Sequence, residues 1–247
     1  MSNIPSELKY TKDVIYLNDG EVAEINREEL VITTVDNVVQ TPYIQELKME
    51  LEQLEKGGFE HFMLKEIFEQ PRALTDTIGT RAILHSADVD LDGISFDREE
   101  VEKIRGISLV ACGTAYYACM VGRYMIQQLS GIPVEVDLAS EFRYHKPILS
   151  SNHLVVPVSQ SGETADTLAA LREGHDQGAR VLAICNTRDS TIARESDDVL
   201  YTHAGPEIGV ASTKCFTAQI VALYLLALKL AIVRGRFTEA ETREHLQ

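Results

Sequence analysis

The chain has little positive charge and no long apolar run. Its 247 residues include 38 Asp and Glu against 23 Lys and Arg, a formal net charge of −15. A nucleic-acid or anionic-membrane partner is disfavoured, because both require clustered positive charge. No stretch approaches the roughly 20 uninterrupted apolar residues that span a bilayer, and Met1–Lys12 lacks the apolar core and basic flank of a secretory signal. The sequence therefore predicts a cytoplasmic protein with no nucleic-acid and no membrane partner.

Metal and redox motifs are also missing. The four cysteines, at positions 112, 119, 185 and 215, form no Cys-x-x-Cys pair, and the seven histidines show no metal-ligand spacing. His-Glu-x-x-His, Gly-x-Ser-x-Gly and Gly-x-Gly-x-x-Gly do not occur, which leaves metalloprotease, α/β-hydrolase and dinucleotide-binding functions without support. We therefore expect free structural cysteines, no metal site and no organic cofactor.

One acidic segment matches the pattern of a calcium-binding loop. Asp88–Gly93, with Glu99 six residues after the glycine, has the acidic spacing of such a loop. Its interior fits poorly, because Phe96 occupies a position that is usually polar, and residues 82–87 before it are only weakly helical. No second copy exists to pair with it. We expect a solvated turn rather than a Ca²⁺ site.

The chain divides into two parts that differ in net charge and in the pattern of expected strands and helices. Residues 1–105 hold 23 acidic and 11 basic residues, whereas residues 106–247 hold 15 and 12. In the first part, short strands are expected, with a hairpin across Asn18-Asp19-Gly20, because Asp-Gly between alternating runs favours a tight turn. Three short strands are too few to close a core alone. The expected elements are strands at 13–17, 22–25 and 29–34, a helix at 44–56, and a second helix from 61 to about 77 interrupted near Pro71.

From residue 107 the sequence alternates apolar strands with helical segments. This alternation predicts a parallel sheet covered on both faces by right-handed crossovers, and continuous apolarity in the strands fits a sheet buried on both sides. The fold class is therefore α/β: a three-layer α/β/α sandwich with a five-stranded parallel sheet of flavodoxin-like order 2-1-3-4-5. The expected strands are 107–111, 134–138, 154–158, 181–185 and 199–201, and the expected helices are 116–129, 140–144, 164–177, 191–195 and 213–233.

Ligands of such sheets bind at the carboxyl ends of the strands, where the strand order reverses. The loop after the third strand, Ser159–Thr164, offers three hydroxyl groups, a glycine that permits close backbone approach, and the N-terminus of a helix. It faces Gly113-Thr114 after the first strand. The absence of a lysine excludes a nucleotide P-loop and favours a monophosphorylated small molecule. The alternative is that these Ser and Thr residues only cap a helix.

A third small-residue segment, Gly209–Lys214, follows the fifth strand and also leads into a helix. Here a helix cap with a solvated Lys214 is as good an interpretation as a binding loop.

Several motifs together resemble the glutamine–fructose-6-phosphate aminotransferase (isomerizing), or glucosamine-6-phosphate synthase, family. They are His61–Ile67 with Glu69-Gln70-Pro71, Ala111–Thr114, Ala139–Tyr144, Ser159–Thr167 and Glu207–Lys214. The resemblance implies residues 1–40 as the C-terminal remnant of a glutaminase domain, 41–75 as a helical connector, and 76–247 as the first sugar isomerase (SIS) domain. The family's glutaminase nucleophile and second SIS domain have no counterpart in this sequence, so none of its residues is expected to be catalytic.

The resemblance also implies a ligand and its contacts. The ligand is a hexose phosphate, fructose 6-phosphate or glucosamine 6-phosphate, without a cofactor or a metal. The implied substrate-binding residues are Thr114, Ala115, Ser159, Gln160, Ser161, Thr164, Val210 and Ala211. Ala115 departs from the family's usual serine, which removes one hydroxyl at a cost of about 0.5–1.5 kcal/mol. A homodimer through SIS domains is implied. The alternatives are a non-catalytic sugar-phosphate sensor and an oligomerisation module.

Overall fold

The computed structural model describes residues 11, 13–15, 17–18, 20–46 and 55–247. The chain forms two units, Met1–Gly57 and Gly58–Gln247. The predicted connector, 41–75, is therefore shared between the two units, and the three domain ranges given above stay predictions.

The described part of the first unit consists of short strands. The strands are β1 (Asp13–Ile15), β2 (Glu21–Ile25), β3 (Leu30–Thr34), β4 (Val39–Gln40) and β5 (Ile44–Glu46). β2, β3 and β4 form one antiparallel sheet, and β1 pairs antiparallel with β5. Among the residues of this unit whose side chains the structure describes, only Ile32 is buried.

Two predictions for this unit are wrong. The Asn18-Asp19-Gly20 segment does not join a hairpin, because β1 pairs with β5 and β2 pairs with β3. Ile44–Glu46 is a strand rather than the start of a helix. Short extended segments become strands through the partner with which they pair, and the turn residues next to a segment do not determine which partner that is. The remainder of the expected helix, from 47 to 54, lies outside the described residues.

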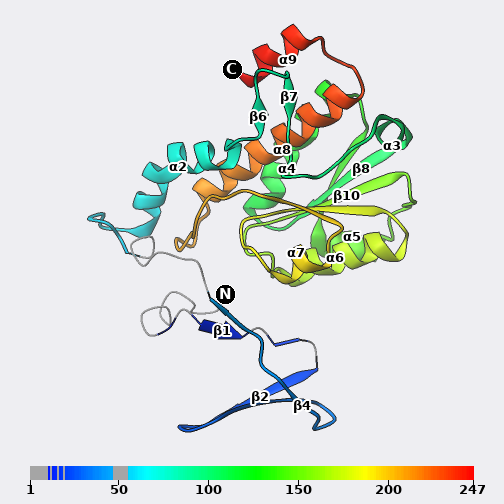
Figure 1. Ribbon diagram of the computed structural model, residues 1–247. Coiled ribbons are helices and arrows are strands. Elements are labelled where there is room, and N and C mark those ends of the chain that lie inside the picture. Colours follow the sequence, from blue (N-terminus) through cyan, green and yellow to red (C-terminus); the bar gives the residue numbers. More distant parts are fainter. Residues whose placement is uncertain (1–10, 12, 16, 19, 47–54) are drawn as a thin grey trace. The chain divides into compact units, whose positions relative to one another are not determined.

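The second unit is the predicted three-layer α/β/α sandwich (Figure 1). Its sheet has the order β9-β8-β10-β11-β12 with all strands parallel, which confirms the expected order 2-1-3-4-5. The sheet strands are β8 (Gly106–Ala111), β9 (Val134–Leu138), β10 (His153–Ser159), β11 (Arg180–Cys185) and β12 (Asp198–Tyr201). The helices are α2 (Phe62–Ile78), α3 (Arg98–Lys103), α4 (Thr114–Ser130), α5 (Ala139–His145), α6 (Ala165–Asp176), α7 (Thr191–Glu195), α8 (Lys214–Val233) and α9 (Glu239–Leu246).

Each face of the sheet has its own apolar core. One core lies between the sheet and α4 with α8, and the other lies between the sheet and α5, α6 and α7 (Figure 1). Because strand side chains alternate between faces, Leu109 belongs to the first core and Val110 to the second. Both side chains are fully buried. The sheet is therefore covered on both sides, as its continuously apolar strands predict.

Helix α8 lies in the centre of the first core. An 18-residue stretch of this 20-residue helix has a mean hydropathy of 2.1, so by length and composition alone the helix is apolar enough to cross a membrane. More than half of it is buried, and it packs against α4 and α2. The packing accounts for its apolarity, since a helix enclosed by other elements needs no polar face.

Helix α2 continues through Pro71, where an interruption was expected. Proline has no N–H, so the carbonyl of Ile67, four residues earlier, loses its usual helical partner. The Gln70 side chain replaces that partner, because its Nε2 donates to the Ile67 carbonyl at 3.2 Å. This side-chain hydrogen bond satisfies the carbonyl without breaking the helix.

Candidate functional site

The predicted binding loops leave neighbouring strands at one edge of the sheet. β8 and β10 pair in parallel, with Ala111 opposite Val158 at their carboxyl ends. The next strand in sequence after β8, β9, lies on its other side, so the strand order reverses between β8 and β10. Such a reversal separates the two following loops and leaves room for a ligand between them. The loops after β8 and β10 therefore start where the sequence analysis expects a binding site.

The loop after β10 is folded around its own hydroxyl groups. Ser159 is buried, and its Oγ accepts the Gly162 N–H at 3.0 Å and lies 3.2 Å from the Thr164 Oγ1. The Ser161 Oγ accepts the Glu163 N–H at 3.2 Å. Gly162 has φ +68°, and a Cβ at this position would lie 2.5 Å from the Ser190 Cβ and still closer to its Oγ. Only glycine fits this turn, so the loop is preformed.

The segment after β11 forms hydrogen bonds with the same loop. The Gln160 carbonyl accepts from the Asn186 N–H at 3.3 Å, and the Gly162 carbonyl accepts from the Ile192 N–H at 3.0 Å. The Glu163 carboxylate accepts the Thr191 N–H at 2.8 Å. The one charged side chain of Ser159–Thr164 is thus engaged with α7, which leaves hydroxyl and amide groups as the polar groups of the loop.

Helices α4 and α6 begin at this edge without a side-chain cap. No side chain of the described residues caps Gly113 at the start of α4 or Thr164 at the start of α6. Elsewhere in the unit, α3 is capped by Asp97 and α9 by a capping box at Thr238, whereas α2 and α5 also begin without a side-chain cap. The Thr164 hydroxyl does not cap α6, because it lies 3.2 Å from the Ser159 Oγ instead. The N-terminal N–H groups of α4 and α6 are donors suited to an anion.

Thr114 and Ala115 occupy the first turn of α4. Thr114 is exposed, whereas Ala115 is 8% exposed and belongs to the apolar core against the sheet. Among the predicted contacts, Ser159, Gln160, Ser161 and Thr164 share one loop, and the two α4 residues follow the neighbouring strand.

Val210 and Ala211 lie further away, in the loop after β12. Both are exposed, and no hydrogen bond within the described chain joins either one to the other predicted residues. Asn186 connects the Ser159–Thr164 loop with the loop after β12. Its backbone N–H donates to the Gln160 carbonyl at 3.3 Å, its Nδ2 donates to the Gly205 carbonyl at 2.7 Å, and its Oδ1 accepts from the Thr202 hydroxyl at 2.9 Å. The sequence analysis missed Asn186, and nothing in its sequence neighbourhood singles it out.

The start of α8 is capped, as one interpretation of Gly209–Lys214 expects, but the cap comes from Glu207. Its carboxylate accepts the N–H groups of Thr213 at 2.8 Å and Cys215 at 3.2 Å. Lys214 is not solvated: its Nζ donates to Glu69 on α2 at 2.7 Å, and its side chain is 5% exposed. The N-terminus of α8 is therefore already occupied by a protein carboxylate.

Cys185 ends β11 beneath the Ser159–Thr164 loop. Burial raises the pKa of its thiol to about 12, which keeps it protonated at neutral pH. The described cysteines are all free, and Cys119, Cys185 and Cys215 are buried. They fit the expectation of structural thiols.

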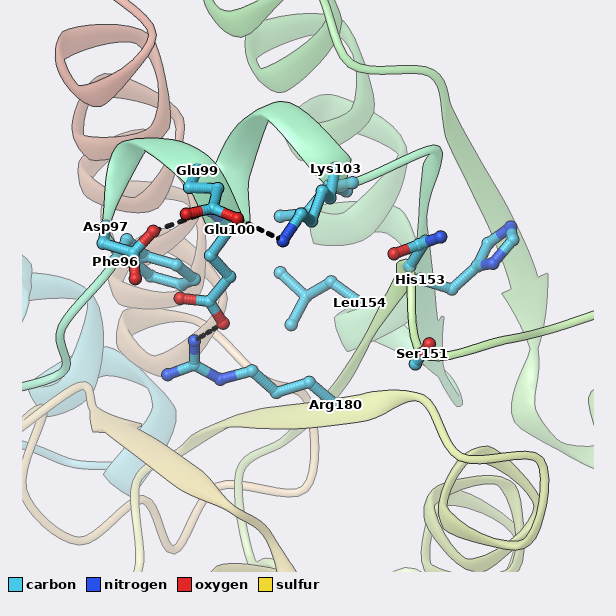
Figure 2. A pocket seen from close by; sticks show the side chains of 11 residues that line it. Phe96, Asp97, Glu99, Glu100, Lys103, Ser151, His153, Leu154 and Arg180 are labelled. Carbon is cyan, nitrogen blue, oxygen red and sulfur yellow. Dashed lines mark hydrogen bonds and ion pairs between the residues drawn. The ribbon is translucent and has the colours of Figure 1, made fainter.

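A pocket of about 270 Å³ lies at the opposite, amino end of the sheet (Figure 2). It is lined by α3, by the turn before β10 and by Arg180 at the start of β11. Arg180 forms ion pairs with Glu100 and Asp198, and Lys103 pairs with Glu99 at 2.7 Å. Desolvation lowers the pKa of Arg180, but the hydrogen bonds to these carboxylates outweigh it and leave the pKa raised. Arg180 and Lys103 of this pocket therefore already have carboxylate partners within the protein.

The acidic segment Asp88–Gly93 forms separate ion pairs rather than one cluster. Asp88 accepts from Lys229 at 2.9 Å, Asp92 pairs with Arg81, and the Asp90 Oδ1 accepts the Gly93 N–H at 3.1 Å. No group of three potential metal ligands occurs in the described part of the chain. The segment is thus a structural turn, more strongly paired than a solvated one, and residues 82–83 before it form strand β6 with β7 (Asp88–Val89) rather than a helix.

Comparison with known proteins agrees with this architecture. The model of the SIS domain family matches residues 100–229, more than half of the chain. These residues include the sheet and both loops at its reversal point. The chain therefore belongs to the SIS domain family.

Relatives of known name make the relationship more specific. The chain is 49% identical over 98% of its length to glutamine–fructose-6-phosphate aminotransferase (isomerizing) of Caldanaerobacter subterraneus subsp. tengcongensis, and 52% identical over 97% to that of Symbiobacterium thermophilum. A solved structure, the C-terminal domain of glucosamine-fructose-6-phosphate aminotransferase from Francisella tularensis, matches 78% of this chain and 53% of its own, with a TM-score of 0.72 and 41% identity. The chain spans about 40% of the length of the two full-length relatives.

Proposed function

We propose that the chain binds a hexose phosphate, fructose 6-phosphate or glucosamine 6-phosphate, between the loops that follow β8 and β10. The observation that carries this proposal is the uncapped start of α6 beside the preformed Ser159–Thr164 loop. Uncapped N–H groups and hydroxyl groups bind a phosphate without a neighbouring lysine. The expected contacts are Thr114, Ala115, Ser159, Gln160, Ser161 and Thr164, with Val210 and Ala211 near the sugar.

The names of the relatives extend this proposal to a reaction. We infer that the chain is the sugar-phosphate-binding part of a cytoplasmic enzyme that transfers glutamine-derived nitrogen to fructose 6-phosphate and isomerises the product to glucosamine 6-phosphate. These 247 residues span about 40% of the length of the two relatives. We therefore expect these 247 residues to bind the sugar phosphate without turning it over, and without a metal or organic cofactor.

Thermal unfolding with added ligand tests the binding proposal. Fructose 6-phosphate is expected to raise the unfolding midpoint, because a ligand that binds only the folded state stabilises it, whereas unphosphorylated fructose is expected to have no effect. Ser161→Ala should weaken the affinity about 10- to 100-fold if the hydroxyl bonds the charged phosphate. Ser151→Ala, an exposed serine at the opposite end of β10, is the matched control and should behave as wild type. A wild-type midpoint that fructose 6-phosphate does not change would refute the proposal.

A homodimer is supported by an apolar face on α4. Tyr117, Met120, Val121 and Tyr124 lie three and four residues apart, and each is 40–59% exposed. This spacing places them on one side of the helix. Light scattering after size-exclusion chromatography is expected to give twice the monomer mass of 27.5 kDa, and Tyr124→Glu is expected to give the monomer. A wild-type monomer at high concentration contradicts the dimer.

A further inference from the structure

The loop after β12 is held in place by a carboxylate from a different element. Glu66 lies on α2 and is 2% exposed. Its Oε1 accepts the N–H groups of Ile208 at 2.6 Å and Gly209 at 2.9 Å. No Lys, Arg or His side chain of the described residues forms an ion pair with it. A buried carboxylate needs compensating donors, and here those donors are the two backbone amides.

The approach of α2 to this loop depends on the absence of a side chain at position 209. A Cβ on Gly209 would lie 2.5 Å from the Glu66 Oε2 and 3.4 Å from the Met63 Cα. Backbone and carboxylate therefore meet directly, and a larger residue would move the loop away from the helix.

The same loop contains Val210 and Ala211, the two predicted contacts that lie outside the loops after β8 and β10. Val210, which directly follows the clamped amide, has a fully exposed side chain, and Ala211 is exposed as well. Glu207 fixes the far side of the loop to the start of α8, since its carboxylate accepts the Thr213 N–H at 2.8 Å. The exposed Val210–Ala211 segment is thus held between two carboxylates.

We propose that Glu66 is a positioning residue for the sugar-phosphate site. It holds the Ile208–Gly209 backbone so that Val210 and Ala211 reach the bound sugar, although Glu66 itself contacts no ligand. This inference depends on the hexose-phosphate binding proposed above. It also gives α2, part of which belongs to the predicted connector, a direct effect on the geometry of the site.

Glu66→Gln tests the proposal while conserving the shape of the side chain. An amide oxygen in the place of Oε1 can still accept both N–H groups, but the amide NH₂ then puts a donor in the place of Oε2, which accepts the Gly209 N–H at 3.2 Å. The substitution also removes the negative charge that strengthens these hydrogen bonds. Calorimetric titration of the 247-residue protein with fructose 6-phosphate is expected to show a Kd raised about 5- to 30-fold. Amide hydrogen exchange without ligand is expected to accelerate at Ile208 and Gly209.

Glu69→Gln is the matched control on the same helix. Glu69 is the ion-pair partner of Lys214 and Lys65 and forms no hydrogen bond with the 208–211 backbone in the described part of the chain. We expect this variant to lower the unfolding midpoint while keeping the Kd within about twofold of wild type. Gly209→Ala tests the same contact from the side of the loop, because the added Cβ would push the loop away from α2 while residue 66 stays a glutamate. This variant should also raise the Kd.

The outcomes separate the two proposals. A wild-type protein that does not bind fructose 6-phosphate refutes the binding proposal and, with it, the positioning role. Wild-type binding with an unchanged Kd in Glu66→Gln overturns the positioning role alone. Equal loss of affinity in Glu66→Gln and Glu69→Gln also overturns it, because the loss then follows stability. Unchanged exchange at Ile208 and Gly209 would show that Glu66 does not fix the loop.

Discussion

The two ends of the parallel sheet carry different kinds of polar groups. At the carboxyl ends of β8 and β10, the loops present hydroxyl groups and two uncapped helix N-termini. At the amino ends of β10 and β11, the pocket of Figure 2 is lined by charged side chains that pair with one another.

This difference shows why a hollow on the surface is a weak indicator of a binding site. The amino-end pocket has a volume of about 270 Å³, but Arg180, Glu100 and Lys103 already have protein partners. A ligand there would have to break existing ion pairs before forming its own contacts. At the carboxyl end the donors of α4 and α6 have no side-chain acceptor within the described chain. Binding capacity is therefore indicated by uncommitted donors rather than by volume.

Gly162→Ala is expected to damage the carboxyl end most severely. The substitution adds a side chain at φ +68°, where it would also overlap Ser190. We expect the free energy of unfolding to fall by about 2–5 kcal/mol, together with loss of fructose 6-phosphate binding. Urea denaturation and calorimetric titration measure the two effects.

Gly178→Ala is its matched control. Gly178 has φ +80°, but a Cβ there would meet no atom within 4 Å. Only backbone strain of about 1–2 kcal/mol is expected, with sugar-phosphate affinity unchanged. Equal losses in both variants would mean that the packing against Ser190 does not matter for the loop.

Arg180→Ala is expected to affect the amino end alone. It leaves the Glu100 and Asp198 carboxylates without their cation, so the free energy of unfolding should fall by about 1–3 kcal/mol. The Kd for fructose 6-phosphate should not change, because the proposed site lies at the other end of the strands. Lys103→Ala, which breaks the exposed Lys103–Glu99 pair of the same pocket, should have little effect on either quantity. Weaker sugar-phosphate binding in Arg180→Ala would place the ligand in the amino-end pocket instead.

The contrast between the ends also explains what the sequence could predict. Strand–helix alternation and continuously apolar strands such as Val155–Val158 determine the parallel sheet and its order, because a buried sheet leaves few other arrangements. The position of the Ser159–Thr164 loop after a central strand could be predicted for the same reason, whereas its role in binding stays a prediction from its residue types.

Long-range polar contacts could not be predicted in this way. Glu66 precedes Gly209 by more than a hundred positions, and a glutamate on an amphipathic helix is ordinarily expected to be solvated. Nothing local indicates that it accepts two amides of a distant loop. The false hairpin at Asn18-Asp19-Gly20 has a related cause, since the partner of β1 is β5 rather than its neighbour in sequence.

The smallest expected effect is a pH dependence at the carboxyl end of the sheet. His203 follows β12, and burial, followed by the nearby Arg81 and Arg188 guanidinium groups, lowers its pKa below the usual 6.5, although Asp92 opposes the shift. Below pH 6.5 the unfolded chain therefore binds more protons at this position than the folded protein does. The free energy of unfolding consequently falls as the pH drops through this range and is fully recovered above it.

His203→Asn removes this titration, and asparagine tolerates the backbone φ of +52° at this position. Because the side chain is about one-third exposed, solvent screening keeps the effect small. Between about pH 7.5 and pH 5.5, the unfolding midpoint of the variant should fall by about 1–2 °C less than that of wild type. Differential scanning calorimetry across this range measures the difference. Parallel pH profiles would mean that the imidazole takes up its proton equally in both states, and that the guanidinium groups at this end of the sheet do not affect it.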